Sequence, residues 1–159
     1  MANAYVNARK YELAIIQYQK ALELHPNDST LLYHLGWAYV YTHAYDKGVE
    51  AIKNSLALEG GDPQLSPDLA YIDGLTGKKD ESRRILGRVL DLARTHQVSP
   101  GLIAMIYIGL NEREQALTWL ERAYRQHSPM MAWLKADPRF DGIRQEPRFQ
   151  ELMRRVGLI

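Results

Sequence analysis

The sequence contains no cysteine, which excludes disulfide bonds, thiolate zinc sites and cysteine nucleophiles together. It also lacks a long apolar run: the longest, GLIAMIYIGL at residues 101–110, has about half the roughly 20 residues that a transmembrane helix needs. The opening residues, MANAYVNARKYE, do not show the basic and then apolar pattern of a signal peptide. We therefore predict no membrane association and, because an absence of cysteine fits a reducing compartment, a cytoplasmic location.

An excess of charge of one sign is missing too. The chain of 159 residues has 20 Lys and Arg against 19 Asp and Glu, which gives a formal net charge of +1. This balance provides no strong field to attract nucleic acid, so we predict no nucleic-acid partner. The remaining composition, 46% hydrophobic and 25% charged, is that of about one globular domain.

Motifs for catalysis and for cofactors are absent from the sequence. There is no HExxH, no Gly-rich phosphate loop and no G-x-S-x-G. Asp68 and Asp73 are five residues apart, which is poor spacing for one helix face. We predict no catalytic residue, no metal site, no cofactor and no enzymatic activity. A small-ligand sensor that uses Asp68, Asp73 and His34 is an alternative.

A period of 34 residues runs through most of the chain. One column of small residues recurs without insertion: Ala14, Gly48, Ser82 and Ala116. A column of tyrosines also recurs, with an interruption at Asp73: Tyr5, Tyr39 and Tyr107. Small residues in an apolar helical stripe let two backbones approach, and a large side chain there costs about 1–3 kcal/mol. The columns therefore predict helices that cross closely.

The pattern resembles the tetratricopeptide repeat family, in which each unit is a pair of antiparallel helices in about 34 residues. The second unit carries the fullest match, with these signature residues: Gly36, Tyr39, Tyr45, Gly48, Ile52 and Ser55. The resemblance implies an all-α fold, a right-handed α-solenoid of helix-turn-helix pairs with a short C-terminal helical cap. We expect four units in residues 1–128, at 1–28, 29–62, 63–96 and 97–128, and capping helices at 129–159.

The unit at 1–28 is predicted to be truncated, because only half of its first helix precedes the turn. This would leave Ile15 and Tyr18 on the second helix poorly covered. We interpret the chain as a piece of a longer protein. A homo-oligomer that forms through Ile15 and Tyr18 is the alternative.

Serine–proline pairs mark three predicted helix starts, because a hydroxyl can cap a helix whose first turn tolerates proline. They are Ser66-Pro67, Ser99-Pro100 and Ser128-Pro129. Asn27-Asp28-Ser29 predicts a further start. Because the loop Gly60-Gly61-Asp62-Pro63 intervenes, the first helix of the third unit should be short.

The tail contains a duplicated motif: Asp137-Pro138-Arg139-Phe140 is followed nine residues later by Glu146-Pro147-Arg148-Phe149. Each copy has an acid, a helix-starting proline and an aromatic residue, which predicts two short helices. The side chains expected to face inward are Trp133, Phe140, Ile143, Phe149, Leu152 and Met153. The tail resembles C-terminal tetratricopeptide regions of bacterial multidomain regulators, which implies a sensor or docking module.

In the family, the first helices of the pairs line a concave groove. The resemblance places the groove at Asn3, Asn7, Tyr33, Trp37, Tyr41, Tyr71, Leu75, Met105 and Ile108. This surface is aromatic and apolar, which suits an amphipathic helix or an extended peptide with hydrophobic anchors.

We therefore predict a non-enzymatic protein-interaction scaffold, as a module of a larger bacterial regulatory protein. Its main anchoring residues would be Tyr33, Trp37, Tyr71 and Met105. A groove that is filled by the chain's own tail, or whose residues serve packing alone, is the alternative.

Overall fold

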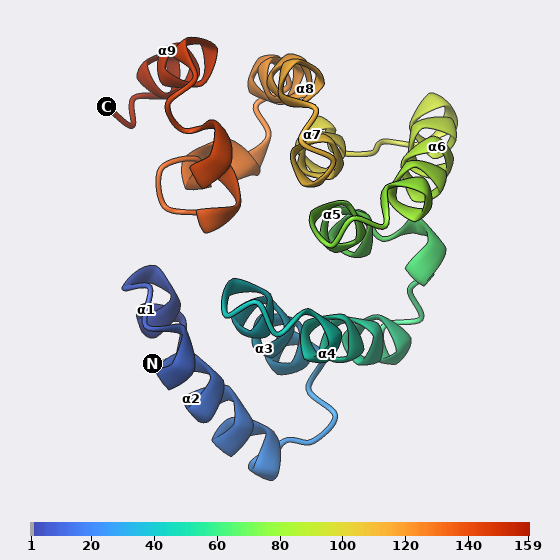
Figure 1. The fold of residues 1–159 in the computed structure, drawn as a ribbon, viewed down its shortest axis with the longest axis vertical. Coiled ribbons are helices and arrows are strands. Elements are labelled where there is room, and N and C mark those ends of the chain that lie inside the picture. The colour runs from blue at the N-terminus through green and yellow to red at the C-terminus, as the bar shows by residue number, and fades with distance from the viewer. Residues whose placement is uncertain (1) are drawn as a thin grey trace. The chain divides into compact units, whose positions relative to one another are not determined.

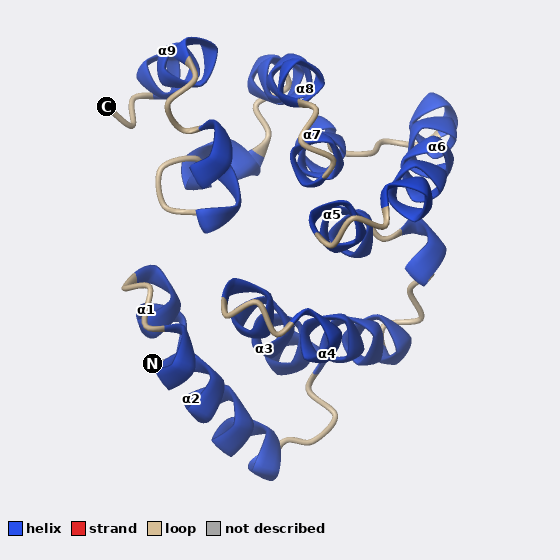
Figure 2. Cartoon of the chain, in the orientation of Figure 1, coloured by secondary structure: helices blue, strands red, loops and turns tan. Residues whose placement is uncertain are grey.

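The computed structural model describes residues 2–159 apart from the side chain of Asn3, and this part of the chain contains helices and no strand (Figures 1 and 2). The predicted all-α fold is therefore confirmed. The chain divides into two compact units, Met1–Pro63 (unit 1) and Gln64–Ile159 (unit 2).

Unit 1 consists of α1 (Ala2–Asn7), α2 (Tyr11–Leu24), α3 (Ser29–Tyr41) and α4 (Tyr45–Leu58), each packed against the next. Its core gathers around four buried side chains: Ala14, Tyr18, Leu35 and Ala38. The start of α3 is set by Asp28, whose carboxylate accepts a hydrogen bond of 2.9 Å from the amide of Leu31.

Unit 2 begins within the 3₁₀ turn η1 (Pro63–Leu65) and contains α5 (Pro67–Leu75), α6 (Lys79–Thr95), α7 (Pro100–Gly109) and α8 (Arg113–Arg125). Helix α5 packs on α6 and on α7, and α7 packs on α8. With 9 residues, α5 is shorter than α3 with 13, as predicted for the first helix of the repeat at 63–96. The tail follows as η2 (Pro129–Trp133), η3 (Pro138–Ile143) and α9 (Pro147–Val156).

Four turns have the same backbone geometry at the 34-residue period. Each contains a residue with positive φ, between 57° and 84°: Arg9, His43, Gly77 and Asn111. In each turn, the amide of the next residue donates a hydrogen bond of 2.8–2.9 Å to a backbone carbonyl. The acceptor is the tyrosine of the repeated column in three turns and Asp73 in the fourth. Because this bond uses only the backbone, Asp73 can replace tyrosine there without loss of the turn.

Glycines allow two close helix crossings. A Cβ atom on Gly48 would lie 3.0 Å from the carbonyl oxygen of Gly36, where α3 crosses α4. On Gly109 it would lie 2.4 Å from the carbonyl oxygen of Tyr71, where α5 crosses α7. The column of small residues predicted the first crossing, and all four of its members are buried. The column did not predict the second crossing.

The serine–proline helix starts are only partly as expected. Ser66 caps α5, because its hydroxyl accepts a hydrogen bond of 3.3 Å from the amide of Leu69. Ser99 and Ser128 begin α7 and η2 without capping them. Their hydroxyls lie 3.3 Å from each other instead, so this hydrogen bond links the α6–α7 connection to the α8–η2 connection.

The tail begins its last two helical segments at the predicted prolines, although the first of them is a 3₁₀ helix. Five of the six side chains predicted to face inward are buried: Phe140, Ile143, Phe149, Leu152 and Met153. The prediction for Trp133 is wrong, since it is 58% exposed. Met131 and Leu134, three residues apart on a turn of 3₁₀ type, take the buried positions.

Candidate functional site

A row of aromatic rings lies along α3. Tyr33, Trp37 and Tyr41 are four residues apart, so they share one helix face. The ring centroids are 6.4 Å apart for Tyr33 and Trp37 and 5.8 Å apart for Trp37 and Tyr41. Tyr11 extends the row from α2, 5.0 Å from Tyr41. We call these four residues the aromatic row.

The aromatic row is partly accessible. Tyr11, Tyr33 and Tyr41 are half-buried, whereas Trp37, between two of the rings, is only 5% exposed. The three tyrosines therefore form the accessible part of the row, and Trp37 packs between two of them. Tyr11 was not among the predicted groove residues; the signal was its place at the first position of α2, beside the turn that follows α1.

The other predicted groove residues differ in exposure. Asn7 is exposed at the end of α1, and the side chain of Asn3 lies outside the described residues. In unit 2, Leu75 is exposed and Ile108 is half-buried.

Tyr71 and Met105 are 7% and 1% exposed. Both lie on helices packed against other elements, since α7 contacts α5, α8 and η3. Their side chains are therefore covered within the chain, as is that of Trp37, and the anchoring role proposed for these three positions stays a prediction.

The predicted self-association residues are at least half-buried. Tyr18 is buried and its ring stacks on His34 at 5.9 Å, and Ile15 packs on the core of unit 1. The expectation that the truncated first helix leaves them poorly covered is wrong for Tyr18, because α1 and α3 supply the contacts, while Ile15 is half-buried. The exposed apolar side chains of α2 are Leu13, Ile16 and Leu24.

His34 lies between two aromatic rings, stacked on Tyr18 and edge-on to Tyr33 at 5.6 Å. Burial lowers the pKa of His34 below its ordinary value, and the nearby carboxylate of Asp28 opposes this shift. Burial also raises the pKa of Tyr18. His34 therefore acts as a neutral packing residue of unit 1 near neutral pH.

The lowered pKa of His34 predicts a loss of stability in acid. The unfolded chain takes up the proton near pH 6.5, and the folded chain only at lower pH, so stability should fall as pH decreases from about 7 toward the folded pKa. Thermal unfolding at pH 7.5 and 5.5 measures this loss. It should shrink in His34→Phe and persist in the control His25→Gln, since His25 is exposed. An equal loss in all three proteins would contradict the assignment.

Ion pairs connect the tail to the helices of unit 2. The guanidinium of Arg148 lies 2.7 Å from the carboxylate of Glu114 and 2.9 Å from that of Glu121, both on α8. These carboxylates, with the hydrogen bond to Glu121 foremost, raise the pKa of Arg148. Arg139 lies 3.6 Å from Asp68 on α5. The duplicated motif predicted the tail helices, but its sequence contained no signal for these partners.

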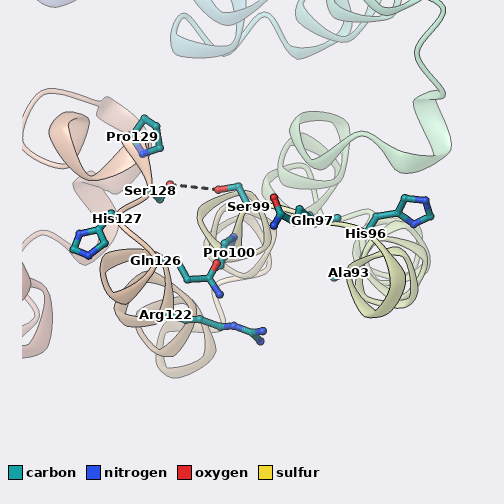
Figure 3. A pocket seen from close by; sticks show the side chains of 11 residues that line it. Ala93, His96, Gln97, Ser99, Pro100, Arg122, Gln126, His127, Ser128 and Pro129 are labelled. Carbon is teal, nitrogen blue, oxygen red and sulfur yellow. Dashed lines mark hydrogen bonds between the residues drawn. The ribbon is translucent and has the colours of Figure 1, made fainter.

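A pocket of about 650 Å³ lies in unit 2 between the α6–α7 and α8–η2 connections (Figure 3). The described residues that line it include Arg122 and two histidines, and none of them carries a carboxylate. The guanidinium of Arg122 lies 4.9 Å from the ring centroid of Trp119. Figure 3 shows His96 and His127 on opposite sides of the hydrogen-bonded Ser99 and Ser128, so the two imidazoles do not converge on one ligand position.

The sensor alternative depends on residues that serve packing and ion pairing. His34 lies in unit 1, and Asp68 of unit 2 faces Arg139. No group of three or more His, Asp or Glu in the described residues is arranged to hold a metal ion. Over the same residues, no helix combines the length and the apolar character needed to cross a bilayer.

The consecutive pairs of helices place the protein in the class of helical repeat proteins. Two sequence profiles, both of the tetratricopeptide repeat, match the chain, one at residues 17–59 and the other at residues 1–28 and 101–126. The chain is 27% identical over 131 residues, 77% of its length, to Tetratricopeptide repeat protein 21B of Homo sapiens. Over 72 residues, 45% of its length, it is 41% identical to the Mus musculus protein of that name.

Tetratricopeptide repeat protein 21A of Mus musculus is 24% identical over 127 residues, 80% of the chain. The aligned part covers 10%, 5% and 9% of these three relatives in turn, so the chain spans about a tenth of their length or less. The profiles, the relatives and the helical structure agree that this is an all-α protein with tetratricopeptide repeats. Repeats of this kind are typical of protein–protein interaction scaffolds, and a catalytic role is not typical of them.

Proposed function

We propose that the chain is a non-enzymatic module that binds a segment of another protein through the aromatic row of α2 and α3. The partner would supply hydrophobic anchors, either from an amphipathic helix or from an extended peptide. Asn7 would extend the surface in unit 1, and Leu75 and Ile108 would form an apolar surface in unit 2. We also propose the division at residues 28, 62, 96 and 128 as that of the repeats.

The aromatic row is the observation that carries this proposal. Four rings follow one another at centroid distances of 5.0–6.4 Å, and three of them are partly accessible. Tyrosine is frequent among residues that dominate binding energy, because its ring contributes a large apolar area and its hydroxyl a hydrogen bond. The neighbouring rings hold each tyrosine in place, which lowers the entropy lost on binding.

We expect Tyr33→Ala together with Tyr41→Ala to abolish capture of the partner while unit 1 stays helical. Loss of two hot-spot side chains costs about 2 kcal/mol or more each, which is at least about 30-fold in affinity per residue. Bait proteins incubated with a lysate of the source organism, followed by quantitative mass spectrometry, measure the loss. Circular dichroism verifies the helical content.

Tyr45→Ala is the matched control, because Tyr45 is also half-buried in unit 1 but is not a member of the row. Its hydroxyl lies 2.7 Å from Nδ1 of His43. Proteins kept by wild type and Tyr45→Ala but lost from the double variant would support the proposal. The same proteins on all three baits would contradict it.

We further propose that the module is part of a larger regulatory protein. The relatives, which are about ten times longer than the aligned part or more, support this. The likeness of the tail to C-terminal regions of bacterial multidomain regulators suggests one setting for it.

Self-association is a second candidate function, favoured by the exposed side chains of α2. Leu13, Ile16 and Leu24 lie on its outer surface, and Leu24 is 78% exposed. A second copy of the chain could cover them. This candidate gains support if the baits recover only the chain itself and light scattering shows a mass that rises with concentration.

A further inference from the structure

We propose that the tail segment Asp137–Ile143 is an intramolecular ligand of α5 and α7, and that a partner segment with arginine next to an aromatic residue competes for the same surface. This inference depends on the proposed interaction role of unit 2. It names the chemistry of the partner and a regulatory state in which the surface is already occupied.

The position of η3 supports the inference. It packs on α7, and its Arg139 faces Asp68 on α5. Helices α5 and α7 are the ones expected to line the binding groove in unit 2. Two of the four predicted groove residues on them, Tyr71 and Met105, are buried, and the other two are accessible. A segment from outside could take the position of η3 on α7 only where the tail moves away.

The segment Asp137–Ile143 combines a buried ring, packed on α9, with a charge pair to α5. Phe140 is completely buried, and its ring centroid is 5.6 Å from that of Phe149. Beside it, Arg139 is held by the carboxylate of Asp137 at 2.6 Å and lies 3.6 Å from that of Asp68. Because the side chains of Arg139 and Asp68 are largely buried, water screens their attraction less than that of an exposed pair.

The two copies of the tail motif have different partners, which separates a ligand-like role from simple capping. Arg139 of the first copy faces the groove helix α5, whereas Arg148 of the second copy pairs with Glu114 and Glu121 on α8. If the tail served only as a cap, loss of either arginine would have similar consequences. If the first copy is a ligand, only loss of Arg139 should open the surface.

Binding of a synthetic peptide to the full chain tests this. The fluorescein-labelled peptide LKADPRFDGIRQ reproduces residues 134–145. In wild type the tail competes with it, so its apparent affinity is reduced by the fraction of open molecules. We expect it to bind Arg139→Ala at least about tenfold more tightly than wild type. Arg148→Ala should bind the peptide with the same affinity as wild type. A control peptide with alanine at the positions of Arg139 and Phe140 should bind to none of the three proteins.

A charge reversal at Asp68 tests whether this carboxylate is the partner of the arginine. It also gives a result that does not depend on whether Arg139→Ala folds. Asp68→Arg should repel Arg139 and bind the charge-reversed peptide LKADPDFDGIRQ more tightly than the native peptide. Hydrogen exchange should show that this peptide restores protection to α5. Equal peptide binding by wild type, Arg139→Ala and Arg148→Ala, or no preference of Asp68→Arg, would overturn the inference. The peptide is defined by this chain, so failure here is distinct from failure of partner capture at α3.

Discussion

Gly109→Ala is expected to destabilise unit 2 by about 1–3 kcal/mol, although it adds a single methyl group. The Cβ atom would lie 2.4 Å from the carbonyl oxygen and 2.8 Å from the Cα atom of Tyr71. Both are backbone atoms of α5, so no side-chain rotation can relieve the clash and the two helices must separate. Thermal and urea unfolding, followed by circular dichroism, measure the loss.

Gly87→Ala is the matched control for this prediction. Gly87 lies in α6, and a Cβ atom there would have no neighbour within 4 Å. Because alanine favours a helix over glycine by about 1 kcal/mol, this variant should be as stable as wild type or more stable. If Gly109→Ala and Gly87→Ala unfold at the same temperature and urea concentration, the close crossing of α5 and α7 does not contribute to stability as we argue.

Phe149→Ala is expected to cost about 3–5 kcal/mol, because it removes a fully buried ring and leaves a cavity. The ring packs at 5.6 Å from Phe140, and these two aromatic residues link α9 to η3. Their loss should release the tail before the remaining helices unfold. Hydrogen exchange resolved along the chain should show lost protection in residues 137–156 at a temperature at which α2–α4 are unchanged.

Trp133→Ala is the control in the same tail. It also replaces a large aromatic residue by alanine, but Trp133 is mainly exposed, so the change should stay within about 0.5 kcal/mol. A loss at Trp133 as large as that at Phe149 would mean that burial does not determine the contribution of these rings.

The repeat explains why so much of the fold could be predicted. The small residues at a 34-residue period are buried, and four equivalent turns recur at the same period in the structure. Both are local consequences of a helix pair. A close crossing needs a small residue, and the turn needs a residue with left-handed backbone conformation. Helix type, the prolines that begin helices and the short α5 follow from residues near one another in the chain.

Exposure within the candidate site was less predictable. The family pattern selects the face of α3 that carries Tyr33, Trp37 and Tyr41, and the structure places these rings in one row. Which of the rings stays accessible depends on the rings beside it, including Tyr11 from another helix. Trp37 is 5% exposed whereas Tyr33 and Tyr41 on the same helix face are half-buried, and the regular spacing along α3 does not distinguish these positions.

The sequence by itself determined the helical class, the period, the small residues at the α3–α4 crossing and the aromatic face of α3. Only the tertiary structure decided that Gly109 meets the backbone of Tyr71, that Trp133 is exposed, and that Arg139 faces Asp68 while Arg148 faces Glu114 and Glu121. The physical reason is the distance along the chain between the residues that interact. Periodicity encodes which side chains share a helix face, whereas burial and ion pairing depend on which distant segment covers that face.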